Sequence, residues 1–325
     1  MRAVTVTANA AVDVSYLLGR LEVGGVNAVQ EVIAGAGGKG NNVARVLARL
    51  GHEVTATGFA GGAAGAFIAE ALRRSGIAAE FEPIPGESRR CLTVIDRTGG
   101  SVTELREPGE PLPAGAAARL IDRVTRLARQ ADAVAICGSL PPGAPDDLYA
   151  TLVSGLRSSP VFVALDSSGE PFGRGLEGGP DLIAPNASEM AELIGRLGSV
   201  GDAVARTQRE VIGRLLPATS RVLLKLGAGG AILVGREWAI KATPPAVAAV
   251  NPVGCGDALL AGFLASGAGR TDPAADLAFA VAVGTAAALR YGIGEIDPVA
   301  VADILGKVRI ESIAPGGEAT REWTG

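Results

Sequence analysis

Short apolar runs alternate with segments of helical spacing along most of this sequence, and this alternation limits the folds that the chain can adopt. It predicts an α/β fold in which helices cover both faces of a mostly parallel sheet. Several strand candidates end in Gly, Asn or Asp, at the edge where open α/β sheets bind ligands. The strand candidates are residues 3–9, 53–59, 133–138, 161–167, 181–186, 221–227 and 231–235. The helix candidates are residues 42–50, 65–75, 116–130, 146–156, 188–197 and 203–216.

Two segments, 13–35 and 88–109, break the alternation. Each contains short alternating pieces joined by Gly-rich turns, and "RTGG" is a hairpin signal, so we expect antiparallel strands of a small accessory sheet. The alternative is a pair of long surface loops, but a lid over a ligand cleft is favoured because a candidate site flanks each segment. The turn-rich tail 312–325 is predicted to be disordered, which leaves a single domain over residues 1–311.

Composition excludes several classes of function. The net charge of −4 provides no long-range positive field, so neither nucleic acid nor an anionic membrane is an expected partner. The longest apolar run, 277–289, is shorter than the roughly 18 to 20 residues that span a bilayer and predicts a buried helix. A single histidine, His52, excludes a multi-histidine metal site. The three cysteines show no framework spacing and the N-terminus has no export signal, so we expect a cytoplasmic protein.

The stretch "NPVGCGDALLAG", residues 251–262, carries the strongest chemical signal. Gly254 and Gly256 allow backbone N–H groups to point at one spot, directly before a helix whose N-terminal dipole is positive, and this predicts an anion hole. Asp257 lies beside it and could take a proton from a hydroxyl group. The alternative is an aspartate that only caps a helix. Cys255 is interpreted as a small side chain tolerated between two glycines rather than as a nucleophile.

A second glycine-rich element, "GAGGKGNNVARVLARLG" at residues 35–51, also opens an amphipathic helix. It has neither the Walker spacing nor a Rossmann fingerprint. Lys39 stands among glycines at a helix N-terminus, where it can meet an anion, and the Asn42 side chain can bind hydroxyl groups. Two such elements in one α/β chain indicate two anionic or polyhydroxylated ligands.

These motifs resemble those of the ribokinase/PfkB-type carbohydrate kinases, over residues 5–310, and most of all the branch of 1-phosphofructokinases and tagatose-6-phosphate kinases. The resemblance implies a ribokinase-like fold with a β-sheet lid. "TANAAVD" resembles the opening strand and implies that Asp13 binds sugar hydroxyls. "GGKGNNVARVLARLG" implies substrate contacts from Gly38, Lys39 and Asn42, and "GESRRCLTV" implies that Arg89 meets the substrate phosphate.

The second half of the chain continues the resemblance with "ICGSLPPGAPDDLYA", "LDSSGE", "APNASEM", "LGAGGAILV" and "NPVGCGDALLAG". "APNASEM" implies that Asn186 and Glu189 order hydrated Mg²⁺ and the nucleotide phosphates. "LGAGGAILV" implies nucleotide contacts from Gly227 and Gly229. The last motif resembles the family's second signature, and the anion hole and catalytic aspartate fall on its residues Gly254, Cys255, Gly256 and Asp257.

The resemblance implies a kinase that uses ATP and Mg²⁺ to phosphorylate a hexose monophosphate. Asp257 would accept the hydroxyl proton, while Lys39 and Arg89 would hold the phosphate already on the sugar. Fructose 1-phosphate is the first choice of substrate, followed by tagatose 6-phosphate, fructose 6-phosphate and then an unphosphorylated sugar or nucleoside. A non-catalytic sugar-phosphate sensor and a NAD-dependent oxidoreductase are disfavoured, the first by the full motif set and the second by the missing fingerprint.

Five positions depart from the family's usual residues. Cys255 replaces the alanine of the anion-hole motif, whose backbone donors do not depend on that side chain. Ala184 stands where many relatives have a lysine. Lys225 stands before the nucleotide-side glycine loop, where a small hydroxylated or apolar residue is common, and it could compensate for the missing lysine. Cys91 and Ala28 depart on the substrate side, so the exact sugar stays open. The sequence also leaves open activation by a monovalent cation such as K⁺, regulation, and the oligomeric state, although exposed lid strands could pair in a homodimer.

Overall fold

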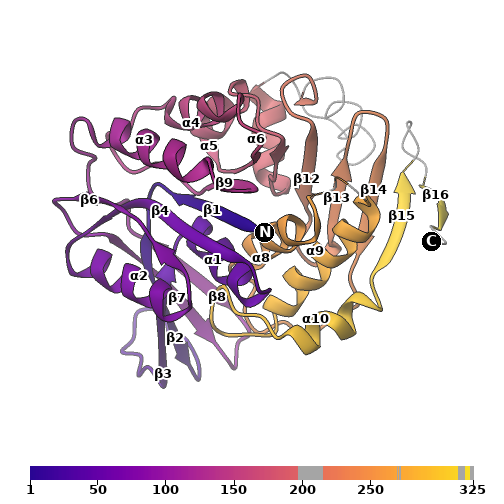
Figure 1. Cartoon of the computed structure of the whole chain (residues 1–325). Helices are drawn as coiled ribbons and strands as arrows, with labels where there is room; N and C mark the ends of the chain where they lie inside the picture. Colours follow the sequence, from indigo (N-terminus) through magenta and orange to yellow (C-terminus); the bar gives the residue numbers. More distant parts are fainter. Residues whose placement is uncertain (197–214, 269, 271, 314–318, 323–325) are drawn as a thin grey trace.

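The alternating strands form one long sheet in the computed structural model, which describes residues 1–196, 215–268, 270, 272–313 and 319–322 (Figure 1). In spatial order the strands are β16 (Ala319–Glu322), β15 (Arg309–Ile313), β14 (Ala239–Thr243), β13 (Ala231–Val234), β12 (Arg221–Lys225), β11 (Leu182–Ile183), β10 (Phe162–Asp166), β9 (Ala133–Cys137), β1 (Arg2–Thr7), β4 (Glu53–Gly61) and β5 (Ala78–Ala79), with β6 (Glu82–Ile84) paired to β4. The sheet is parallel from β12 to β5 and antiparallel from β12 to β16. The predicted α/β fold is confirmed.

Helices cover both faces of this sheet. They are α1 (Lys39–Arg49), α2 (Gly62–Arg74), α3 (Ala116–Ala128), α4 (Leu148–Leu156), α5 (Gly169–Glu177), α6 (Ala187–Arg196), α8 (Cys255–Ser266), α9 (Pro273–Ala287) and α10 (Pro298–Leu305). Figure 1 shows α3 to α6 along one side and α1, α8 and α9 along the other. Neighbouring strand residues face opposite sides, so β-branched Val134 packs under α3 and α4 while small Ala135 packs under α1 and α8.

The two segments that break the alternation form a separate four-stranded sheet, which we call the lid. Its order is β3 (Glu31–Gly37), β2 (Ala11–Leu18), β7 (Arg89–Asp96) and β8 (Val102–Arg106). Both hairpins are antiparallel, as expected, but the central pair, β2 and β7, is parallel. Each hairpin leaves the core separately, and the two join through their first strands, β2 and β7. Because both first strands run away from the core, they pair in parallel. The alternative of two unstructured loops is wrong.

Residues 312–313 and 319–322 of the tail predicted to be disordered form strands, and the rest of the tail lies outside the described residues. Residues 309–313 form β15 on the edge of β14, and residues 319–322 form β16 on β15, because the antiparallel edge offers unpaired backbone groups. The helix predicted over 203–216 falls mainly on residues 203–214, which lie outside the described residues. Residues 277–287 of the apolar run 277–289 lie in the buried helix α9, as predicted, and the last two residues follow its end. Within the described ranges, no helix is long and apolar enough to cross a bilayer.

Candidate functional site

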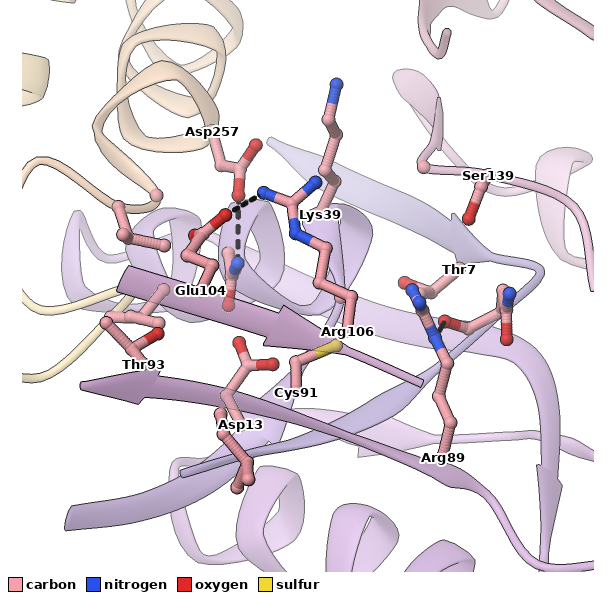
Figure 2. Close-up of a pocket in the computed structure, with 18 of the residues that line it drawn as sticks. Thr7, Asp13, Lys39, Arg89, Cys91, Thr93, Glu104, Arg106, Ser139 and Asp257 are labelled. Carbon is pink, nitrogen blue, oxygen red and sulfur yellow. Dashed lines mark hydrogen bonds and ion pairs between the residues drawn. The ribbon is translucent and has the colours of Figure 1, made fainter. Parts of the chain in front are cut away.

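The carboxyl edge of the parallel strands, the N-termini of α1 and α8, and the lid enclose a cavity of about 590 Å³ (Figure 2). Its lining comes from segments far apart in sequence, including Asp13, Lys39, Asn42, Arg89 and Asp257. A cavity of this size suits a small polar ligand. The fold therefore gathers most of the predicted substrate residues around one space.

The N-terminus of α8 has the backbone geometry of an anion hole. Gly254 has φ 79°, a left-handed conformation that favours glycine, and its Cβ would lie 2.6 Å from Ile293 Cγ2. Among the described residues, the backbone N–H groups of Gly256 and Asp257 have no hydrogen-bond acceptor. Two unpaired donors at the positive end of a helix can receive the charge of a phosphoryl group.

Asp257 is buried at this helix start and faces the cavity. Asn42 Nδ2 donates a hydrogen bond to Asp257 Oδ2 at 2.8 Å, which connects α1 to α8. Burial, followed by the negative charge of Asp166, raises the pKa of Asp257 to about 6, while Lys39, Lys225 and the Asn42 hydrogen bond oppose this rise. A carboxylate with this pKa is ionised at neutral pH and still basic enough to take a proton.

Cys255 lies between the two glycines, with its Sγ 3.6 Å from the backbone oxygen of Asn251. Burial, and then the charge of Asp257, raises the pKa of the thiol to about 12. The thiolate needed for nucleophilic attack is therefore strongly disfavoured. This environment fits the interpretation of Cys255 as a tolerated small side chain whose backbone shapes the helix start.

On the lid side, Asp13 of β2 faces the cavity next to the start of α1. A Cβ on Gly37 would lie 2.0 Å from Asp13 Cγ, and a Cβ on Gly38 would lie 2.6 Å from Thr7 Cγ2, so these glycines permit the close approach. Burial and the charge of Asp257 raise the pKa of Asp13 to about 7, against the opposing effects of Arg89 and Arg45. Asp13 and Gly38 therefore both line the cavity where the lid meets the start of α1.

Backbone carbonyl groups hold Arg89 at the entrance of β7. Its Nε donates to the Asn9 oxygen at 3.2 Å and its Nη1 donates to the Glu107 oxygen at 2.9 Å. No carboxylate within the described chain forms an ion pair with Arg89. A guanidinium group that is oriented by neutral acceptors keeps its charge available for an anionic ligand.

Lys39 does not point toward Arg89 (Figure 2). Its Nζ donates to Asp166 Oδ1 at 2.8 Å and to Glu189 Oε1 at 3.1 Å. Although burial opposes the charge, Asp166, Asp257 and Glu189 raise the pKa of Lys39. The expectation that Lys39 and Arg89 hold one phosphate together is therefore not reproduced, because the acidic side chains draw Lys39 to the other side of the cavity.

Asn186 and Glu189 form a reciprocal cap on α6. Glu189 Oε2 accepts from the Asn186 N–H at 2.9 Å, and Asn186 Oδ1 accepts from the Glu189 N–H at 2.8 Å. Lys225 lies in the adjacent strand, since its backbone N–H donates to the Pro185 oxygen at 2.9 Å. The other predicted nucleotide contacts, Gly227 and Gly229, lie in the exposed turn between β12 and β13.

Sequence analysis missed three charged residues of the site. Asp166 ends β10, and its place as the last residue of an apolar run was the available signal. Glu104 and Arg106 alternate on β8, face the cavity and form an ion pair with each other. Arg106 lies directly opposite Cys91 in the register of β7 and β8. The period-two pattern of "VTELR" could have placed both charges on one face.

The chain is similar to known sugar kinases. A model of the pfkB family of carbohydrate kinases matches residues 1–300. A candidate phosphofructokinase from Staphylococcus aureus is 30% identical, with a TM-score of 0.77 over 97% of this chain and 100% of that one. Phosphofructokinase-2 from Escherichia coli in complex with substrates and products is 27% identical, with a TM-score of 0.86 over 94% and 99%. Ribokinase from Arabidopsis thaliana shares the fold, at 22% identity and a TM-score of 0.73 over 93% and 98%.

Proposed function

The chain belongs to the pfkB family of carbohydrate kinases and acts on an alcohol group of a sugar or sugar phosphate, and we propose that its acceptor is a hexose monophosphate. One observation carries this proposal. Asp257 and Arg89 face the same cavity from opposite sides, so a base for a hydroxyl group and a guanidinium group without an ion pair to any described carboxylate could bind one ligand (Figure 2). A hexose that carries its phosphate on one terminal carbon and its acceptor hydroxyl on the other matches this arrangement.

Asp257 would accept the proton as the hydroxyl oxygen forms its bond to the γ-phosphorus of ATP. The N–H groups of Gly256 and Asp257 would hold the charge of the phosphoryl group, and Asp13, Gly38 and Asn42 would bind sugar hydroxyls. Arg89 would hold the phosphate of the substrate. The lid would exclude water from the reaction.

The nucleotide side of the proposal rests on Asn186, Glu189, Lys225, Gly227 and Gly229. Mg²⁺ would be held through the ATP phosphates and water, ordered by Asn186 and Glu189. Bound Mg²⁺ would neutralise charge on those phosphates.

Fructose 1-phosphate is the proposed substrate, with tagatose 6-phosphate next and fructose 6-phosphate third. All three separate the phosphate from the acceptor hydroxyl by the length of the sugar, so the arrangement of Asp257 and Arg89 suits each of them. Fructose 6-phosphate is retained as the third candidate because a structure of the E. coli relative contains it.

A coupled assay of ADP release tests the proposal with Mg-ATP and each of fructose 1-phosphate, tagatose 6-phosphate, fructose 6-phosphate, fructose and ribose. We expect turnover with one phosphorylated hexose, and fructose 1-phosphate as the best substrate. Activity with unphosphorylated sugars alone would overturn the proposal. The assay is repeated with KCl and with tetramethylammonium chloride, because the E. coli relative has been seen in complex with potassium.

A further inference from the structure

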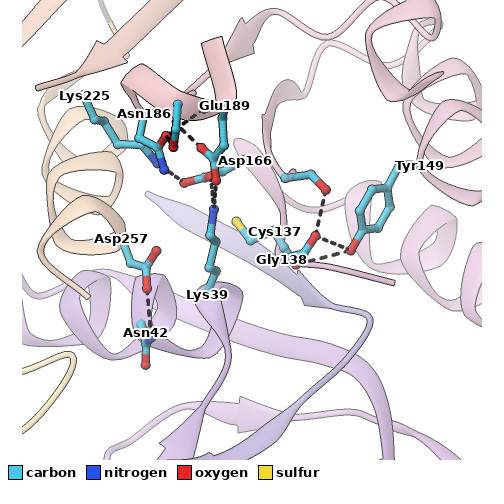
Figure 3. Close-up of polar contacts among 12 residues, drawn as sticks. Lys39, Asn42, Cys137, Gly138, Tyr149, Asp166, Asn186, Glu189, Lys225 and Asp257 are labelled. Atoms are coloured by element: carbon cyan, nitrogen blue, oxygen red, sulfur yellow. Dashed lines mark hydrogen bonds and ion pairs between the residues drawn. The ribbon is translucent and has the colours of Figure 1, made fainter. Parts of the chain in front are cut away.

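A buried carboxylate joins two lysines at the centre of the site (Figure 3). Asp166 is completely buried at the end of β10. Its Oδ1 accepts from Lys39 Nζ at 2.8 Å, and its Oδ2 accepts from Lys225 Nζ at 2.5 Å. Each oxygen of one carboxylate therefore holds the ammonium group of a different element, α1 on one side and β12 on the other.

The burial of this cluster requires that its charges be paired. The side chain of Lys225 is 8% exposed and forms an ion pair with Asp166. An ammonium group taken out of water without a partner is strongly unfavourable, so the ion pair with Asp166 offsets the burial of the Lys225 side chain. Although burial opposes ionisation, Lys225 and Lys39 lower the pKa of Asp166, so the carboxylate stays charged as well.

Lys225 lies against the start of α8. A Cβ on Gly256 would be 3.3 Å from Lys225 Cδ and 3.7 Å from its Nζ. The ammonium group is thus held beside the helix end at which the N–H groups of Gly256 and Asp257 lack acceptors. Lys39 lines the cavity from the other side of Asp166. Two positive charges therefore lie together beside Asp166, close enough to Asp257 to act on its carboxylate.

We propose that Asp166 is a positioning residue, which fixes the ammonium groups of Lys39, at the cavity, and Lys225, against the start of α8, so that both neutralise the phosphoryl group during transfer. The proposal rests on the proposed function. In that step the hydroxyl oxygen bonds to the γ-phosphorus, the bond from that phosphorus to the ADP oxygen breaks, and the proton moves to Asp257. Asp166 contacts none of these atoms and acts through the two lysines.

The charges of Asp166, Lys39 and Lys225 also shift the pKa of the base, Asp257. The groups that act on Asp257 are Asn42 and Lys39 of α1, Asp166 of β10 and Lys225 of β12, and Asp13 of the lid is coupled to it by charge. Asp166 raises the pKa of Asp257, whereas Lys39 and Lys225 lower it. The acid limb of the kcat profile is the range in which kcat falls as the pH is lowered. Removing the charge of Asp166 should therefore move this acid limb to lower pH. Removing the charge of Lys225 should move it to higher pH.

The experiment compares Asp166→Asn and Lys225→Met with the wild type and with Ser167→Ala. Ser167 is the buried neighbour of Asp166 and donates to the Gly138 oxygen at 2.8 Å, so its variant controls for disturbance of the strand end. Thermal melting checks the fold of each variant. The kcat and KM values are measured from pH 5 to 9 with the best acceptor of the sugar panel.

We expect kcat to fall by about 10² in both charge variants, as for the loss of one preorganised donor, with little change in KM for the sugar. The acid limbs should move in opposite directions by about one pH unit, and Ser167→Ala should keep the wild-type limb. Limbs that stay in place, or that move together, would overturn the proposal. If Asp166→Asn does not fold, Lys225→Met alone decides. If the best acceptor is an unphosphorylated sugar, the proposal of a hexose monophosphate as substrate is wrong. The acid limbs of the two charge variants, measured with that sugar, still test the role of Asp166.

Discussion

At the scale of single residues, Asp257 has the environment of a base rather than of a helix cap alone. Its carboxylate is buried, accepts one hydrogen bond from Asn42 and faces the cavity beside unpaired N–H groups. We expect Asp257→Asn to reduce kcat by about 10² or more while the affinities for sugar phosphate and ATP stay close to those of the wild type. Steady-state kinetics and calorimetric titration measure both. Near-normal turnover would remove Asp257 from the role of base.

The raised pKa of Asp257 also predicts a pH dependence. Burial and the charge of Asp166 raise this pKa to about 6, and only the ionised carboxylate can accept a proton. The kcat should therefore be constant above this value and fall as the pH drops through it, by about tenfold per unit. A profile that stays flat down to pH 4.5 would contradict the assignment.

Arg89 provides a test of the phosphate on the substrate. Because its guanidinium group is free of ion pairs with described carboxylates, Arg89→Ala should raise KM for the sugar phosphate by about tenfold or more and leave KM for ATP nearly unchanged. Arg90→Ala is the matched control, since Arg90 is exposed and lies on the other face of β7. Equal KM values in the two variants would indicate that no phosphate meets Arg89.

At the scale of the elements, the junction between β3 and α1 depends on glycine. A Cβ on Gly37 would overlap the carboxylate of Asp13, so Gly37→Ala should displace Asp13, raise KM for the sugar and lower stability by about 1–3 kcal/mol. Gly155→Ala is the control: this helical glycine of α4 has open space around it, and alanine there should be neutral or stabilising. Thermal melting and KM measure the difference, and equal behaviour of the two variants would contradict the close approach.

The periodicity of the sequence was sufficient to predict β1, β4, β9 to β13, most helices and the lid, because burial on one or two faces leaves a regular pattern. It did not predict β5, β6, β14, β15 or β16. β11 is shorter than its apolar run suggests, since Pro185 cannot extend the ladder and Asn186 begins the cap of α6. The site was predicted where glycines and a helix start lie together, as at Gly254 and Asp257. The pairing of Asp166 with Lys225 was not predictable, because the two residues are 59 positions apart and meet only through the order of the strands.

At the scale of the whole molecule, the lid face that points away from the cavity is only partly covered. Directly paired residues Ala34, Val14, Leu92 and Leu105 cross that face, and Val32 stands in the next row. Val32 and Leu105 are 57% and 56% exposed, which is unusual for apolar residues in the middle of a sheet face. We propose that a second copy of the chain covers this surface.

The expected result is a dimer in sedimentation equilibrium that the double change Val32→Glu and Leu105→Glu converts to a monomer. Val299→Glu is the control, because Val299 is 77% exposed on α10, which is not part of the lid sheet. A dimer that survives the double change would place the interface elsewhere, and a monomeric wild type would exclude the proposal.

The way Arg89 is held has a mechanical consequence for the whole molecule. Its guanidinium group binds Asn9, in the connection from the core to β2, and Glu107, directly after β8, so one side chain ties both the entry and the exit of the lid. Rotation of the lid about this point would move the far ends of β2 and β7 most and Arg89 least. The end of the cavity that recognises an anion would then exist before the lid closes, and capture of the substrate would precede its enclosure.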